Sequence, residues 1–351
     1  MPHIDTITGC LLGGAVGDAL GAPVEFMAWP AIESAFGDAG ILDFATAYGG
    51  LGRITDDTQM MLFTAEGLLR GHVRGSSRGI CHRPGVVHHS LLRWLVTQGE
   101  TPATDVDQKG WLIERKELWA RRAPGNTCLT ALRSAKHFGD LPSNTSKGCG
   151  AVMRVASCAF FEGAFDLAAD TGRLTHAHPS GYLSAGLFAD LLRRLYLAPD
   201  LPLAQATGQS LAEHREREGI EETAAALQRV LAFHAQGIAP TPQRIDAFGG
   251  GWVGEEALAI GVWCALFAGD FEEGARLAVN HSGDSDSTGL IAGHLLGLRS
   301  GVAGIPQRWL QALELRDAIE RIARDLYEVP RTFLGGYGEQ DSSIFDAYPG
   351  G

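Results

Sequence analysis

The chain has 351 residues, of which 45% are hydrophobic, and its formal net charge is −12 at pH 7. A chain of this length can bury a large hydrophobic core, so the composition indicates a globular protein. The acidic charge argues against nucleic-acid binding, which needs clustered Lys and Arg.

The six cysteines are scattered, with no CxxC motif and no His pair at ligand spacing. The sequence therefore predicts neither a zinc site nor a disulfide framework. The N-terminal uncharged run, from Thr6 to Asp18, is too short to span a bilayer, and no Lys or Arg precedes it. We expect a cytoplasmic protein without a membrane partner, and we expect a monomer.

Glycine recurs at every fourth position in the first predicted helix, at Gly9, Gly13, Gly17 and Gly21. This spacing places the glycines on one helix face. Because each glycine inside a helix costs about 1 kcal/mol relative to alanine, the stripe predicts close approach of another backbone or of a ligand. Further along, Glu25 follows Asp18 by about two helical turns, so both acids can point the same way.

Two helix starts carry oxygen ligands. Thr55, Asp56 and Asp57 precede one apolar run, and Asp284 and Asp286 precede another at residues 281–297. At either place alone, such residues are also typical of an ordinary N-cap. The repetition favours a shared cation site, and a set of oxygen ligands favours Mg²⁺ or Mn²⁺ over zinc.

The stretches between these two helices show only local patterns. Residues 71–84 are predicted to be a flexible connection, and the apolar residues at 111–119 to form one face of a helix. His88 and His89 are typical of surface or capping histidines. A further helix is predicted to begin at Asn126 or Thr127.

Three later segments could contact a ligand. Residues 146–150 form a small-residue loop before a predicted helix, which suits either phosphate binding or a plain connection. His176 stands before a long predicted helix and could be a cap or a catalyst. Trp252 lies among glycines, where it could stack on a ligand ring or cover the core.

The hydrophobic periodicity is helical throughout, with no sustained alternation typical of strands. We therefore expect a compact, many-helix, all-α fold, with residues 1–351 as a single domain.

Six segments, in this order along the chain, resemble the ADP-ribosylglycohydrolase family: GAVGDALGAPVEF at 14–26, TDDT at 55–58, GCGAVMRVA at 148–156, LTHAHP at 174–179, GGGWVGEEAL at 249–258 and SGDSDSTGLIAGHLLG at 282–297. The resemblance implies an all-α enzyme with two neighbouring Mg²⁺ or Mn²⁺ ions that removes ADP-ribose from modified proteins. Bacterial members reverse ADP-ribosylation of arginine.

Matching positions imply the roles of individual residues. The implied metal ligands are Thr55, Asp56, Asp57, Asp284, Asp286 and a hydroxyl from either Ser287 or Thr288. The implied ADP-ribose contacts are Ser146, Gly148, Cys149, Gly150, Met153 and His176, to which Trp252 is added as a stacking candidate. The catalytic candidates are Glu25, Asp56 and Asp284.

The expected activity is hydrolysis of the bond between ADP-ribose and a protein side chain, most directly that of arginine. The alternatives are another ADP-ribose linkage such as serine, a di-metal phosphoesterase, and a non-enzymatic binding or structural protein. The aspartate set argues against a structural role, since mutually repelling carboxylates would then have no purpose.

Overall fold

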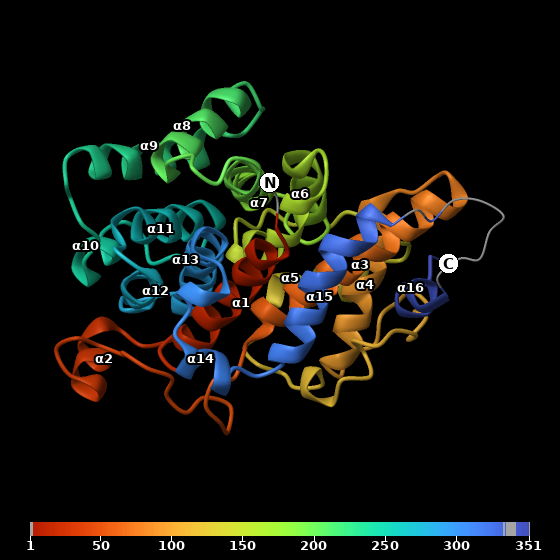
Figure 1. The fold of residues 1–351 in the computed structure, drawn as a ribbon, viewed down its shortest axis with the longest axis horizontal. Coiled ribbons are helices and arrows are strands. Elements are labelled where there is room, and N and C mark those ends of the chain that lie inside the picture. Colours follow the sequence, from red (N-terminus) through yellow and green to blue (C-terminus); the bar gives the residue numbers. More distant parts are fainter. Residues whose placement is uncertain (1–2, 333, 335–341, 351) are drawn as a thin grey trace.

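The computed structural model describes residues 3–332, 334 and 342–350, and the regular structure assigned there is entirely helical (Figure 1). The expected all-α fold is confirmed. The α-helices of the described residues are α1 (Ile4–Gly21), α2 (Trp29–Phe36), α3 (Asp56–Arg78), α4 (Arg83–Thr97), α5 (Asn126–Ser134), α6 (Ala164–Arg173), α7 (Pro179–Leu197), α8 (Leu203–His214), α9 (Glu221–Ala235), α10 (Pro242–Asp246), α11 (Gly254–Phe267), α12 (Phe271–Val279), α13 (Ser285–Ser300), α14 (Gln307–Ala312), α15 (Arg316–Glu328) and α16 (Ser342–Ala347). Short 3-10 helices are η1 (Lys116–Leu118), η2 (Cys149–Arg154), η3 (Ala156–Phe160), η4 (Val302–Gly304) and η5 (Val329–Arg331).

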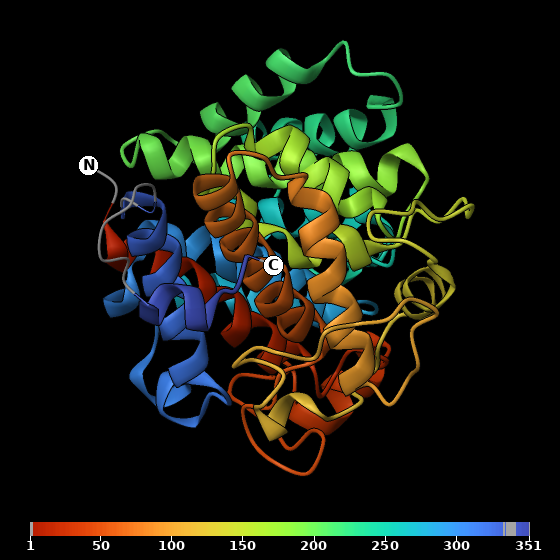
Figure 2. The same ribbon diagram turned by 90° about the vertical axis from the view of Figure 1, so that its right-hand side faces the viewer.

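Helices α1 and α13 lie side by side in the middle of the molecule (Figure 1). Helices α8 and α9 lie toward one end, while α3, α4, α15 and α16 lie toward the other. Figure 2 shows α3 and α4 next to each other across the face seen from that second end.

The glycine stripe of α1 is the contact surface with α13. Gly9, Gly13 and Gly17 meet the backbone of Gly297, Gly293 and Gly289 in antiparallel order. A Cβ atom added at Gly17 would lie 1.9 Å from the Gly289 carbonyl oxygen, so a side chain there would force the helices apart. The prediction of close backbone approach is confirmed, and the packing brings the C-terminal end of α1 to the N-terminal end of α13.

The buried hydrophobic side chains form one cluster that extends along the chain from Ile7 to Tyr348. In the part of the chain that the structure describes, no helix combines the length and the apolar character that a membrane crossing requires.

Two expectations about helices were wrong. Residues 111–119 form turns and η1 instead of a helix; Trp119 is 49% exposed, and its ring nitrogen donates to the Ile113 carbonyl. Helix α3 continues through Gly71 and Gly75 to Arg78, because its packing on α4 outweighs the low helix propensity of these glycines. The helix predicted at residue 126 begins there, as α5.

The prediction that His88 in α4 is a surface or capping histidine was also wrong. It is fully buried, and its Nδ1 accepts from the Gly139 backbone N–H at 2.7 Å. Burial lowers the pKa of His88 to about 4, so the ring is neutral at pH 7.

Candidate functional site

Three chain segments meet where α1 ends and where α3 and α13 begin. The turn after α1 brings Glu25, the start of α3 brings Thr55, Asp56 and Asp57, and the start of α13 brings the segment from Asp284 to Ser287. The glycine contact between α1 and α13 places the first and third segments together. Residues from opposite ends of the sequence therefore share one site.

Three carboxylates are in direct proximity there. Glu25, Asp284 and Asp286 each offer an oxygen, and these atoms all lie within 4.8 Å of one another. The α3 segment joins them through Asp57, whose Oδ2 accepts from the Ser287 hydroxyl at 2.7 Å.

The structure shows which of these residues cap a helix and which do not. Thr55 caps α3, because its Oγ1 accepts from the Asp57 N–H at 3.3 Å. Asp284 precedes α13 but makes no side-chain capping bond to it. Its carboxylate instead accepts from the Cys149 thiol at 2.7 Å, so ordinary capping does not explain this aspartate.

Burial and mutual repulsion disfavour the charged forms of these acids. Burial, followed by the carboxylates of Asp286 and Asp284, raises the pKa of Glu25 to about 11. Burial and Asp286 likewise hold the pKa values of Asp56, Asp57 and Asp284 well above their usual range. In the protein alone, the cluster must therefore hold protons at neutral pH.

The donor set fits a divalent cation. Within the described ranges, none of the five carboxylates of the site forms an ion pair with Lys or Arg; these are Glu25, Asp56, Asp57, Asp284 and Asp286. The buried Oε2 of Glu25 also has no hydrogen-bond partner among the described residues. Carboxylate and hydroxyl oxygens are the ligands that Mg²⁺ and Mn²⁺ prefer. A bound cation would allow these groups to ionise together.

Ser287 and Thr288 differ in where their hydroxyls point. The Ser287 hydroxyl donates to Asp57 at the centre of the cluster. The Thr288 hydroxyl lies 2.7 Å from the Ala278 carbonyl and 2.8 Å from the Asp284 carbonyl, and it also pairs with His281. Thr288 therefore ties α13 to the segment before it, while Ser287 faces the acids.

A cavity of about 550 Å³ opens over this cluster. Each of the residues expected to contact ADP-ribose lines it, with the exception of Ser146, whose hydroxyl accepts from the Gly148 N–H at its edge. The lining includes Glu25, Phe26, Asp56, Asp57, Arg121, Gly125, Asn126, Thr127, Cys128, Gly148, Cys149, Gly150, Met153, His176, Trp252, Asp284 and Ser287.

For the loop at 146–150, the sequence leaves phosphate binding and a plain connection both open. It leads into the short 3-10 helix η2, and its Cys149 N–H already donates to the Trp252 carbonyl at 3.2 Å. Position 150 has room only for glycine, because an added Cβ would lie 2.7 Å from the Cys128 sulfur and 3.0 Å from the His176 ring. The loop contributes a close-fitting wall.

His176 and Trp252 occupy opposite extremes of exposure in this cavity. His176 is buried, its Nδ1 pairs with the Thr175 hydroxyl at 2.8 Å, and burial lowers its pKa to about 3. The neighbouring His178 is the residue that caps α7. Trp252 is 45% exposed and stacks on Phe26 with ring centroids 5.8 Å apart, so it does not cover the core.

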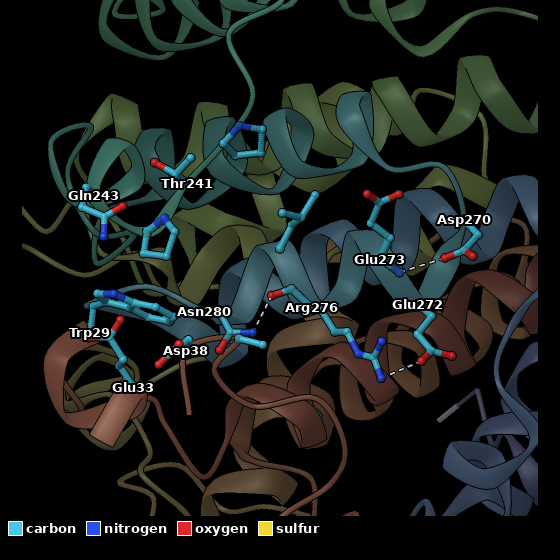
Figure 3. Close-up of a pocket in the computed structure, with 14 residues that line it drawn as sticks. Trp29, Glu33, Asp38, Thr241, Gln243, Asp270, Glu272, Glu273, Arg276 and Asn280 are labelled. Atoms are coloured by element: carbon cyan, nitrogen blue, oxygen red, sulfur yellow. Dashed lines mark hydrogen bonds and ion pairs between the residues drawn. The ribbon is translucent and has the colours of Figure 1, made fainter. Parts of the chain in front are cut away.

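A larger cavity, of about 770 Å³, lies between α2, α10 and α12 (Figure 3). Several of its polar groups are already engaged: Asp270 caps α12, and Glu272 pairs with Arg276. It contains none of the residues of the acidic cluster, so its size does not make it the better candidate.

With this geometry established, comparison with known proteins identifies the family. A sequence profile of the ADP-ribosylglycohydrolases matches residues 1–332. The chain belongs to the ADP-ribosylglycohydrolase family. Enzymes of this family act on ADP-ribosylated substrates and are generally metal-dependent, which agrees with the buried acidic cluster.

Individual members of the ADP-ribosylglycohydrolase family align over most of the chain. The chain is 27% identical over 335 residues to ADP-ribosyl-(dinitrogen reductase) glycohydrolase of Rhodospirillum rubrum, covering 91% of this chain and 93% of that protein. It is 25% identical over 339 residues to ADP-ribosylarginine hydrolase Tri1 of Serratia proteamaculans, covering 92% of this chain and 79% of that protein. A solved structure described as an ADP-ribosylglycohydrolase-related protein complex superposes with a TM-score of 0.60 at 27% identity, covering 93% of this chain and 98% of that one.

The structure also assigns positioning residues to this ADP-ribosylglycohydrolase that the motifs did not reveal. Asp18 accepts from the Thr55 and Thr58 N–H groups, at 3.0 and 3.1 Å, and from the Thr58 hydroxyl. Arg122 and Glu314 form an ion pair that holds the Ile54 backbone just before this helix start. The sequence places Asp18 on the same side as Glu25, but nothing in the local sequence signals a contact across tens or hundreds of residues.

Proposed function

We propose that this protein is a metal-dependent hydrolase that cleaves the glycosidic bond between ADP-ribose and a modified protein side chain, with arginine as the acceptor. The observation that carries the proposal is the convergence of Glu25, Asp284 and Asp286 beneath a cavity. The names of the Rhodospirillum and Serratia relatives support the reaction, and the Serratia name supports arginine. The role would be reversal of mono-ADP-ribosylation, either regulatory or protective against a toxin.

We assign two Mg²⁺ or Mn²⁺ ions to the oxygen ligands Thr55, Asp56, Asp57, Asp284, Asp286 and Ser287. Such ions, when bound, would orient the vicinal hydroxyls of a ribose and polarise a water molecule. Ser287 is preferred over Thr288 because its hydroxyl faces Asp57, whereas the Thr288 hydroxyl is held by backbone carbonyls.

The chain's own acids would handle the protons of the reaction. Hydrolysis of a glycosidic bond needs an acid for the leaving group and a base for water. Glu25 lines the cavity beside Asp284, which places its carboxyl group where it can exchange a proton with the substrate or with a water molecule. Asp56 and Asp284 line the same cavity and complete the catalytic candidates.

The cavity walls would hold the rest of ADP-ribose. Trp252 and Phe26 present a stacked aromatic pair at the rim, suited to a base or ribose face. His176 is neutral at pH 7, and because its Nδ1 pairs with Thr175, its Nε2 is the nitrogen that can bond to substrate. Gly148, Cys149, Gly150 and Met153 shape the wall between them, with Ser146 at its edge.

The direct test is release of ADP-ribose from ADP-ribosyl-arginine and ADP-ribosyl-serine, each with and without Mg²⁺ or Mn²⁺. We expect metal-dependent release from the arginine conjugate. Release from the serine conjugate alone would move the assignment to another linkage. No release from either conjugate with either metal would contradict the proposal.

Glu25→Gln separates proton transfer from metal binding. Because Glu25 is proposed to transfer a proton, the variant should keep its metals and ADP-ribose affinity while kcat falls by roughly 10²–10⁴. Metal analysis, titration with ADP-ribose and single-turnover rates measure these three quantities. A variant that loses its metals but retains kcat would exchange the roles assigned to Glu25 and the aspartates.

We further propose that residues 1–351 act as one domain and as a monomer. The hydrophobic cluster, which runs without division from Ile7 to Tyr348, supports the single domain.

A further inference from the structure

A separate cavity of about 650 Å³ opens beside the middle of α3 and shares no lining residue with the acidic site. Basic and aromatic side chains dominate its wall. Its lining residues are Arg70, Arg74, Ile80, His82, Gly85, Val86, His89, Arg93, Asp107, Phe138, Pro349 and Gly350.

Two arginines of this wall have donors that the chain does not satisfy. The side chain of Arg93 is 1% exposed; its Nε and Nη2 donate to Glu66 Oε2 at 3.2 and 2.9 Å, but its Nη1 has no partner among the described residues. Arg70 donates through Nη2 to Glu66 Oε1 at 3.0 Å and leaves its buried Nε unpartnered. Leaving a buried donor unpaired costs about 1–3 kcal/mol, and more when the group is charged.

The local charge is positive although the whole chain is acidic. The guanidinium groups of Arg70 and Arg93 both pair with the single buried carboxylate of Glu66. Glu66 is already shared by Arg70, Arg93 and the Ser90 hydroxyl. Asp107 is exposed, and its carboxylate accepts from the Lys109 N–H. An acceptor for the remaining buried donors must therefore come from outside this group.

The rim adds a surface for an aromatic ring. Phe138 is 46% exposed, and one face of its ring stacks on His89 with centroids 4.3 Å apart. The Nε2 of His89 is also buried and has no partner in the described part of the chain. The cavity has the size of a small-molecule site, which is larger than a bare phosphate requires.

We propose that this cavity binds a small organic phosphate of the nucleoside monophosphate class. The phosphate accepts from the guanidinium groups of Arg93 and Arg70, which line the cavity and each keep a donor that no described residue satisfies, because guanidinium groups form strong charge-assisted bonds with phosphate. The base packs against the exposed face of Phe138. The site is independent of the proposed hydrolase activity, since the two cavities have no residue in common.

Titration calorimetry with AMP and with inorganic phosphate, at constant ionic strength, tests the proposal on the full chain. The titrations are repeated in an Asp286→Asn/Trp252→Ala background, which is expected to weaken ligand binding in the catalytic cavity through loss of both the metals and the stacking ring. We expect AMP to bind in both backgrounds and more tightly than phosphate. Equal affinities for AMP and phosphate would overturn the assignment of an aromatic ligand.

Variants locate the binding. Arg93→Lys keeps a charge for Glu66 but removes the spare nitrogen, so both ligands should bind about tenfold more weakly. Phe138→Ala, at an exposed position, should weaken AMP severalfold and leave phosphate unchanged. The matched control is Arg193→Lys, because Arg193 donates to the Ala159 and Phe161 carbonyls instead of lining the cavity.

The absence of saturable binding by either ligand would overturn the proposal, as would affinities unchanged in both Arg93→Lys and Phe138→Ala. If Arg93→Lys does not fold, Phe138→Ala still tests it: unchanged AMP affinity in that variant excludes this cavity.

Discussion

Helix α3 carries two groups of buried charge that are neutralised in different ways. At its N-terminus, Asp56 and Asp57 join Glu25, Asp284 and Asp286, with no basic partner in the described ranges. Three turns later, Glu66 is enclosed by two guanidinium groups and the Ser90 hydroxyl.

The pKa values follow this difference. Burial alone would raise the pKa of Glu66, but Arg93 and Arg70 hold it below its usual value. At the helix start, burial and neighbouring acids act in the same direction and raise the pKa of Glu25 to about 11. Glu66 has its counterions within the chain, whereas the acids at the start of α3 can ionise together only with a cation from solution.

Asp286→Asn should have the largest effect, because Asp286 raises the pKa of each other acid of the site. Losing this ligand should release the metals and lower kcat/KM by more than about 10³. Metal analysis of the purified variant and the rate of ADP-ribose release measure both. Asp317→Asn, at an exposed ion pair with Arg115, is the control expected to keep full activity. Full activity and full metal content in Asp286→Asn would reject the proposed metal site.

Glu66→Gln should mainly change stability. Removing this charge leaves two buried arginines uncompensated, which typically costs about 3–5 kcal/mol. Urea denaturation should show this loss, while kcat per folded molecule stays close to that of the wild type. Glu320→Gln, which breaks a partly exposed pair with Arg316, should cost less than about 1 kcal/mol. An unfolding free energy unchanged by Glu66→Gln would remove the distinction between the two groups.

Removal of the metals by a chelator should lower the stability of the folded protein, and the loss should increase as pH rises. A ligand at 100 times its dissociation constant adds about 2.7 kcal/mol, so EDTA should lower Tm at pH 7. In EDTA, Asp18 has its pKa raised to about 7 by burial and Asp286, above an unfolded value of about 4. Its contribution to stability is full below pH 4 and is lost as pH rises to 7. The difference between the Tm in Mg²⁺ and the Tm in EDTA should therefore increase with pH. A difference that stays constant with pH would contradict this account.

Trp252→Ala should have the smallest effect of these changes. An exposed stacking contact contributes about 0.5–1.5 kcal/mol, so KM for the ADP-ribosyl conjugate should rise roughly twofold to tenfold while kcat changes little. Phe26→Leu, which leaves the indole in place, should raise KM less. An unchanged KM in Trp252→Ala would leave the stacked pair without a role in substrate binding.

Much of the fold could be predicted from local spacing. The four-residue glycine period predicts a close helix contact because residues four apart share a helix face. Acid and hydroxyl residues before apolar runs predict helix starts, because free N–H groups and oxygen side chains are complementary there. The apolar spacing at residues 111–119 also predicts a helix, but this prediction was wrong, because the segment is short and packs as turns and η1.

The site depended on contacts that no local pattern contains. Asp18 reaches the start of α3, Glu314 pairs with Arg122, and Cys149 donates to Asp284. Ser287 and Thr288 are adjacent and chemically alike, yet their hydroxyls face different surroundings because successive helix positions point about 100° apart. Helix spacing indicates which residues share a face, but what that face meets depends on how distant helices pack.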